Sequence, residues 1–179
     1  QSLANAFKLI EVPIAFGFTD GVEASVAAMH STLADPARRA GVEAAIANQA
    51  IHFDLLGLQL GATYSGPLVV DDGSTAEVLA EPARDYAPST RPGGRLPHAW
   101  LSPGRSTLDL VDPVSFTLLV AEGTDAPVID ATVVAVALDV WQRLSLSPDQ
   151  CLLVRPDQHI AARTTVTVVA DIAAALLPH

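Results

Sequence analysis

The residues that most often carry redox or nucleophilic chemistry are sparse in this chain. Cys151 is its only cysteine. A dithiol motif needs two sulfurs separated by two residues at a helix N-terminus, where the helix dipole lowers the thiol pKa. Cys151 lies in an apolar segment, and we interpret it as a small buried hydrophobic residue. The sequence therefore predicts no thiol–disulfide exchange, and a single thiol fits a reducing compartment such as the cytoplasm.

Histidines and carboxylates are present but are not spaced as metal sites. No two histidines form a ligand pair, and none combines with Cys151 in a zinc pattern. His52 and Asp54 are two residues apart, so on a helix they would not face each other. Asp157, close to His159, is expected to form a turn. We predict no metal site from the five histidines, which are His30, His52, His98, His159 and His179.

Nucleophile and phosphate-binding motifs are also missing from the sequence. It contains neither a G-x-S-x-G elbow nor a glycine-rich dinucleotide or nucleotide loop. Its glycine clusters, at 57–61 and 92–94, do not lie between a predicted strand and a predicted helix. They are therefore not expected to present backbone N–H groups to a pyrophosphate. We predict no catalytic and no cofactor-binding residue.

The most distinctive polar stretch runs over residues 94–101 and continues to Asp109. In a functional interpretation it is a ligand or interface contact, with Arg95 pairing a carboxylate and Trp100 acting as an anchor. In a structural interpretation, which we favour, Trp100 is a core residue and Arg95 braces the loop. For Asp109 a functional contact and the capping of a turn are equally supported. The candidates for a ligand or interface are thus Arg95, His98, Trp100 and Asp109.

Composition excludes some partners and suggests others. Among 179 residues, 20 acidic against 10 basic side chains give a net charge of -10, which disfavours binding to nucleic acid. The longest apolar runs fall far short of the roughly 20 residues that a membrane span needs, and the N-terminus shows no secretory signal. Half of the residues are hydrophobic and only 17% are charged. This excess predicts apolar surface covered by a partner, a second copy or a missing domain.

The first part of the chain, residues 1–60, is expected to be helical. Asp35 is a candidate N-cap, with Pro36 at the first helical position and Gly57 as the stop. Two shorter helices are expected over 3–10 and 22–30. Residues 61–105 form an irregular connector rich in proline and glycine, with short strands possible over 67–70 and 77–80. The long helix has its apolar residues at helical spacing: Val42, Ile46, Ala50, Phe53 and Leu56.

Residues 106–179 have the pattern of an α/β domain. Apolar, β-branched runs over 115–120 and 132–138 are typical of strands buried on both faces. Residues 151–154 and 159–163 flank Pro156-Asp157, a hairpin signal, and a helix is expected over 168–177. The prediction is a thioredoxin-like, four-stranded mixed sheet with flanking helices, lacking a CxxC motif and preceded by the N-terminal helical segment.

Several of these stretches resemble the C-terminal part of FAD-dependent aromatic hydroxylases of the phenol hydroxylase type, including those that act on aromatic polyketides. The resemblance covers nearly the whole chain. It is carried by LLGLQLGATYSG from Leu55, by DYAPSTRPGGRLPHAWL ending at Leu101, and by STLDLVDPVSFTLLV and CLLVRPDQHIAAR. It implies a thioredoxin-like domain without redox cysteines, with structural and association roles. FAD, NAD(P)H and hydroxylation would belong to a flavin domain that lies upstream in the family and is missing here.

The chain departs from the family pattern at three points. Gln158 stands where the hairpin turn usually has glycine, so a left-handed backbone there would cost roughly 1–2 kcal/mol. Ala162 replaces an aromatic residue. Between Val120 and Thr132 only eleven residues remain, close to the roughly 10–12 that a parallel crossover needs. The first helix of the thioredoxin-like unit is therefore expected to be short or lost.

Three interpretations of function follow from these observations. In the first, the chain is the C-terminal part of a flavin monooxygenase, is not catalytic alone, and associates with a flavin-bearing domain or chain, or as a homodimer. In the second, it is a free-standing interaction module or a binder of hydrophobic ligands. In the third, it is an autonomous enzyme such as a cyclase, whose acid/base pair would be His98 with Asp109 or Asp85.

Overall fold

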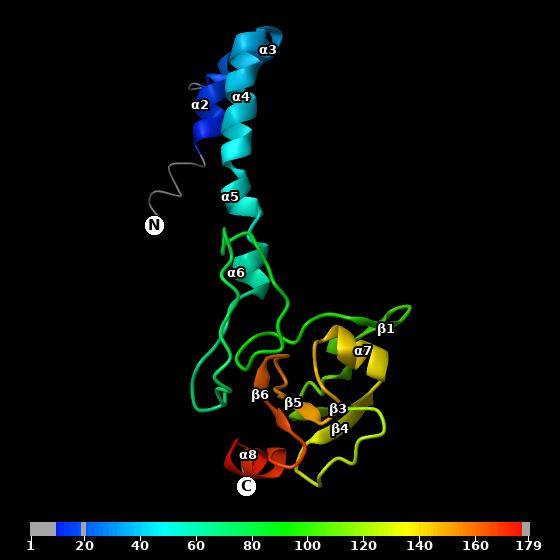
Figure 1. Cartoon of the computed structure of the whole chain (residues 1–179). Helices are drawn as coiled ribbons and strands as arrows, with labels where there is room; N and C mark the ends of the chain where they lie inside the picture. Colours follow the sequence, from blue (N-terminus) through cyan, green and yellow to red (C-terminus); the bar gives the residue numbers. More distant parts are fainter. Residues whose placement is uncertain (1–9, 19–20, 177–179) are drawn as a thin grey trace. The chain divides into compact units, whose positions relative to one another are not determined.

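The computed structural model describes residues 10–18 and 21–176, and Figure 1 shows its helices and strands. The chain divides into two compact units, Gln1–Leu55 and Leu56–His179. The stretch expected as a connector, 61–105, falls in the second unit. The helix expected over 3–10 lies almost wholly outside the described residues.

The first unit is helical, as expected. Its helices are α2 (Glu11–Phe16), α3 (Val22–Ala34), α4 (Pro36–Asn48) and α5 (Ala50–Phe53). The predicted cap of α4 is confirmed, because the Asp35 carboxylate accepts hydrogen bonds from the backbone N–H groups of Ala37 and Arg38, at 2.9 and 3.4 Å. This satisfies two of the amides that a helix start leaves without partners. α3 extends four residues beyond the expected end at His30.

The expectation that one helix runs from Asp35 to Gly57 is wrong. α4 ends at Asn48, α5 follows, and Gly57 lies inside α6 (Leu56–Leu60) rather than at a helix end. Gly57 is buried, and a Cβ at this position would collide with the carbonyl oxygens of Pro82 and Asp85. Glycine is needed there for close backbone approach, not as a helix stop.

The predicted mixed sheet is confirmed. It contains β3 (Thr117–Ala121), β4 (Thr132–Val136), β5 (Gln150–Val154) and β6 (Ile160–Thr165) in the order β4-β3-β5-β6. β3 is parallel to β4 and antiparallel to β5, which forms an antiparallel hairpin with β6. Second–first–third–fourth is the thioredoxin-like strand order. α7 (Leu138–Arg143) precedes β5 and α8 (Val169–Leu176) follows β6 (Figure 1).

The expected burial of the first two strands holds for β3 only. All five residues of β3 are buried, whereas most of β4 is exposed. β4 is an edge strand with no helix in the crossover before it, whereas the other edge strand, β6, is covered by a loop whose Val70 N–H donates to Ala161. The crossover between β3 and β4 contains no helix among its residues, in agreement with the expected loss of the first helix.

Two apolar clusters cover the faces of the sheet. One includes Trp141 of α7 with Leu119 and Leu152, and the other includes Val169 of α8 with Leu118 and Leu153. Alternate residues of β3 and β5 therefore face opposite clusters, as strand geometry requires. The two apolar clusters stabilise the sheet, and the loops that pack against the edge of the sheet are positioned by it.

The segment from 61 to 105 differs from its prediction. Neither 67–70 nor 77–80 is a strand. Pro67 has no N–H to donate, and of the first segment only Val70 reaches the sheet, donating its N–H to the Ala161 carbonyl at 2.8 Å. The strands that do form, β1 (Trp100–Ser102) and β2 (Arg105–Ser106), lie at the end of this segment and were not predicted.

Candidate functional site

The predicted candidates Arg95 and Asp109 both make local structural contacts. The Arg95 backbone forms an isolated antiparallel β-bridge with His159, just before β6. The Arg95 side chain donates from Nη2 to the Gln158 side-chain oxygen at 2.8 Å. Asp109 accepts from the Ser106 N–H at 2.6 Å and from the Ser106 hydroxyl at 2.8 Å, which caps the 3-10 helix η1 (Thr107–Leu110). These bonds from Ser106 lower the pKa of Asp109. Bracing is the structural role that the sequence favoured for Arg95, and capping is one of the two roles that it left open for Asp109.

Trp100 differs from the favoured interpretation. Trp100 is 58% exposed, so the expectation that it is a core residue is wrong. It stands on β1, in a hairpin closed by only two short strands, where no sheet covers it. The exposed His98 ring contacts the Trp100 ring edge to face, with 4.6 Å between ring centroids. The candidates therefore do not form one pocket, because Arg95 points to the hairpin turn while His98 and Trp100 face solvent.

Cys151 occupies the middle of the sheet. It is fully buried on β5, and burial raises the pKa of its thiol to about 12. A thiol with this pKa stays protonated and is a poor nucleophile near neutral pH. The interpretation of Cys151 as a buried hydrophobic residue is confirmed.

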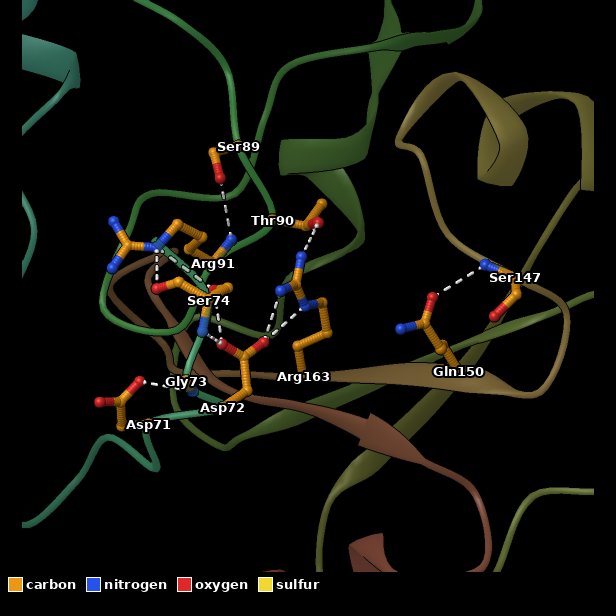
Figure 2. Close-up of polar contacts among 10 residues, drawn as sticks. All are labelled: Asp71, Asp72, Gly73, Ser74, Ser89, Thr90, Arg91, Ser147, Gln150 and Arg163. Atoms are coloured by element: carbon orange, nitrogen blue, oxygen red, sulfur yellow. Dashed lines mark hydrogen bonds and ion pairs between the residues drawn. The ribbon is translucent and has the colours of Figure 1, made fainter. Parts of the chain in front are cut away.

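A polar cluster next to β6 was not predicted. Figure 2 shows the Asp72 carboxylate between the Arg163 guanidinium and Ser74. The Asp72–Arg163 ion pair has N···O distances of 2.7 and 2.6 Å, and Arg163 also donates to the Thr90 hydroxyl at 3.2 Å. Burial raises the pKa of Asp72, but hydrogen bonds from Ser74 and Arg163 outweigh it and the net pKa is lowered. The pair fastens the 71–74 loop to the strand.

Arg91 adds a second guanidinium to the same region. Its Nε donates to the Ser74 carbonyl at 3.1 Å and to the Ser74 hydroxyl at 3.3 Å, and its backbone N–H donates to the Ser89 hydroxyl at 3.2 Å (Figure 2). No sequence spacing could have revealed this cluster, since Asp72 and Arg163 are 91 residues apart. The only signal was the occurrence of arginines in the segments RPGGR and IAAR.

Neither glycine cluster leaves room for a pyrophosphate beside the two glycines that are most closely packed. The carbonyls of Pro82 and Asp85 occupy the space beside Gly57, and the Tyr64 carbonyl occupies the space beside Gly93. Carbonyl oxygens repel a pyrophosphate, which needs converging N–H donors.

Within 10–18 and 21–176 no three histidine, cysteine or acidic residues are grouped to hold a metal ion. Over the same residues, no helix has the length and apolar character to cross a bilayer.

Comparison with known proteins identifies this architecture. Residues 89–177 match the family described as aromatic-ring hydroxylase, C-terminal. The chain is 32% identical over 158 residues to phenol 2-monooxygenase from Pseudomonas sp. (strain EST1001), covering 75% of this chain and 26% of that protein. It is 30% identical over 154 residues to 2,4-dichlorophenol 6-monooxygenase from Cupriavidus pinatubonensis, covering 72% and 26%. The chain thus spans about a quarter of these relatives.

A solved structure agrees with this result. The flavin-dependent monooxygenase PieE, solved in complex with FAD and substrate, matches 97% of this chain with a TM-score of 0.70 and 28% identity, over 35% of its own length. The α/β unit with its four-stranded mixed sheet is thus similar to part of a flavin-dependent monooxygenase. The chain belongs, through residues 89–177, to the aromatic-ring hydroxylase C-terminal family.

Proposed function

We propose that this chain is the structural and association part of an FAD-dependent aromatic monooxygenase and is not catalytic alone. The match of residues 89–177 to a hydroxylase C-terminal family carries this proposal. In the parent enzyme, reduction of FAD by NAD(P)H and hydroxylation of an aromatic or polyketide substrate with O₂ would belong to residues beyond this chain. The proposed setting is the cytoplasm, which the single reduced thiol of Cys151 supports.

Exposed apolar side chains on the first unit support an association role. Val22 is 80% exposed and Phe53 is 79% exposed. Large apolar side chains in such numbers on one small helical unit favour a surface that a further part of the enzyme covers. The set with substantial exposure in this unit is Ile10, Ile14, Phe18, Val22, Val26, Leu33, Ile46 and Phe53.

A flavin-binding measurement tests the first half of the proposal. The purified chain is mixed with FAD and passed through a desalting column, and the protein fraction is examined for flavin absorbance near roughly 450 nm. We expect none, because the described residues do not provide a pyrophosphate cradle. Flavin that stays with the protein would refute the proposal.

An association measurement tests the second half. The intact mass of the chain is compared with the mass that its reading frame encodes. Where the frame also encodes a flavin-bearing segment, that segment is used as the binding partner. We expect Phe53→Ser to weaken association, whereas the control Val128→Ser, at a fully exposed loop position of the second unit, leaves it unchanged. Equal binding by both variants would count against the apolar surface.

The alternative is a free-standing interaction module or a binder of hydrophobic ligands. The same exposed apolar side chains favour it, because they could join two copies of the chain. Sedimentation of the purified chain separates the two functions. A stable homodimer from a reading frame that encodes no flavin-bearing segment would favour the module.

A further inference from the structure

A cleft of about 510 Å³ lies among the loops of the second unit. Arg91 and Gly94 line one part of it, and Ala76, Val78 and Leu79 line another. A second hollow, of about 390 Å³, shares Thr63 and Arg91 with the first. Both volumes fall within the range of small-molecule sites, roughly 300–1,000 Å³. Arg91 therefore stands where two solvent-accessible hollows meet.

The backbone around Arg91 is held firmly against the sheet. Gly93 donates its N–H to the Ile160 carbonyl at 2.7 Å and accepts from Tyr64 N–H at 2.9 Å. Gly94 donates back to the Arg91 carbonyl at 3.1 Å and accepts from Ile160 N–H at 2.9 Å. Gly93 has a φ of 83°, which glycine adopts without strain. These bonds fix Arg91 before any ligand arrives.

The side chain of Arg91 is held in one orientation, but only part of its guanidinium donates hydrogen bonds within the protein. Its Nε is bonded to Ser74, while its two terminal nitrogens make no hydrogen bond to another residue in the described part of the chain. Nor does any carboxylate among those residues lie within the 4.0 Å of an ion pair with Arg91. The arginines that do have such a partner include Arg38, Arg39, Arg143, Arg155 and Arg163.

The chemistry of the cleft restricts what it could bind. Because Nε is bonded to Ser74, the guanidinium keeps one free edge, formed by its two terminal nitrogens, and this edge matches the two oxygens of a carboxylate. The walls include the apolar residues Leu79, Ala87 and Pro88, which suit an aromatic or alkyl body. Asp85 and Glu77 also line the cleft. Their charges disfavour a dianion, although an amide already bonds to Asp85 and Glu77 is exposed to screening solvent.

We propose that this cleft binds a small monocarboxylate with an apolar body, and that Arg91 receives its carboxylate. The site is independent of the proposed association with a flavin-bearing segment, because every lining residue belongs to this chain. A carboxylate without an apolar body would gain only the Arg91 contact. A neutral compound of the same shape would gain only the wall contacts.

An NMR titration of the full ¹⁵N-labelled chain tests this site. The probes are 2-naphthoate, its neutral analogue 2-naphthamide, and acetate. We expect 2-naphthoate to shift the Arg91 Nε–H signal and the amides of 75–79, with 2-naphthamide and acetate binding at least about tenfold more weakly. Equal binding of naphthoate and naphthamide, or equal binding of acetate, would overturn the proposal.

Variants locate the binding in the cleft. Arg91→Met keeps the aliphatic stem and should lower the affinity for 2-naphthoate about tenfold or more, while the control Arg105→Met, at the exposed residue of β2, should leave it unchanged. Ala76→Trp fills the cleft from an exposed position and should have a similar effect without touching Arg91. If circular dichroism shows that Arg91→Met does not fold, Ala76→Trp decides the question.

Two further results would refute the site. One is the absence of any shift with 2-naphthoate up to about 10 mM, an affinity too weak for a binding site. The other is a set of shifts centred on another hollow, either the groove at Phe18 and Met29 or the surface at Trp100 and Pro103.

Discussion

At the scale of single residues, the β5–β6 turn shows how one side chain can offset local backbone strain. Gln158 has a φ of 66°, in the left-handed region that favours glycine. Its side-chain oxygen accepts a hydrogen bond from Arg95 at 2.8 Å, and its N–H donates to the Arg155 carbonyl at 2.9 Å. The left-handed backbone at Gln158 costs roughly 1–2 kcal/mol. The side-chain hydrogen bond, which contributes about 1 kcal/mol, offsets part or most of this cost.

Two substitutions at Gln158 separate these contributions. Gln158→Ala removes the hydrogen bond and keeps the strain, so the free energy of unfolding should fall by about 1 kcal/mol. Gln158→Gly removes both, and it should be more stable than Gln158→Ala by about 1 kcal/mol. Urea unfolding of the two variants and the parent measures this. Equal stability of the glycine and alanine variants would show that the left-handed backbone carries no cost.

At the scale of elements, the turn before β3 depends on one carboxylate. Asp112 accepts hydrogen bonds from the backbone N–H groups of Ser115 and Val114, at 3.0 and 2.8 Å, and from the Thr132 hydroxyl at 3.1 Å. It therefore ties the entry of β3 to the entry of β4. These three bonds, led by the one from Ser115, lower the pKa of Asp112 from 3.8 to about 2.

This lowered pKa predicts a specific dependence of stability on pH. Because the folded-state pKa lies below the unfolded value, the contribution of Asp112 is fully present above 3.8 and is lost as pH falls toward about 2. The stability difference between the parent chain and Asp112→Asn should therefore shrink over that window. An NMR titration should place the midpoint of the Asp112 carboxyl near pH 2. A midpoint near pH 3.8 would contradict the three hydrogen bonds to this carboxylate.

The two tryptophans provide a matched comparison between elements. Trp141 on α7 is fully buried and its indole N–H donates to the Ser147 carbonyl at 2.9 Å, whereas Trp100 on β1 is mostly exposed. Trp141→Ala should lower the free energy of unfolding by about 3–5 kcal/mol. Trp100→Ala should change it by no more than about 0.5 kcal/mol. Similar losses in both variants, measured by chemical unfolding, would mean that Trp100 packs against part of the protein.

The sequence predicted elements best where the controlling signal is local. The cap at Asp35 and the Pro156-Asp157 turn that joins β5 to β6 follow from residues close together in the chain. The solvent exposure of β4 and of Trp100 depends on which neighbours are missing, which periodicity does not encode. The contacts of Asp72 with Arg163, and of Gly57 with Pro82, join distant segments, so only the folded chain reveals them.

At the scale of the whole molecule, the two units differ in how much they bury. Every member of the two apolar clusters lies between residues 70 and 176, in the second unit. In the first unit the described buried residues are only Thr32, Val42, Ala45 and Gln49. A short helical segment with so little buried apolar surface cannot offset the entropy of ordering its chain.

This difference predicts the outcome of cutting the chain at the boundary. A shortened chain of residues 56–179 should unfold cooperatively, with a free energy of unfolding close to that of the sheet in the full chain, because both clusters remain intact. A peptide of residues 1–55 should give no cooperative transition, since it retains few buried contacts. Thermal unfolding of 56–179 is followed by near-ultraviolet circular dichroism, and that of 1–55 by far-ultraviolet circular dichroism, because residues 1–55 contain neither tryptophan nor tyrosine. Loss of the transition in 56–179, with Trp141 no longer buried, would mean that the first unit is needed to complete the fold.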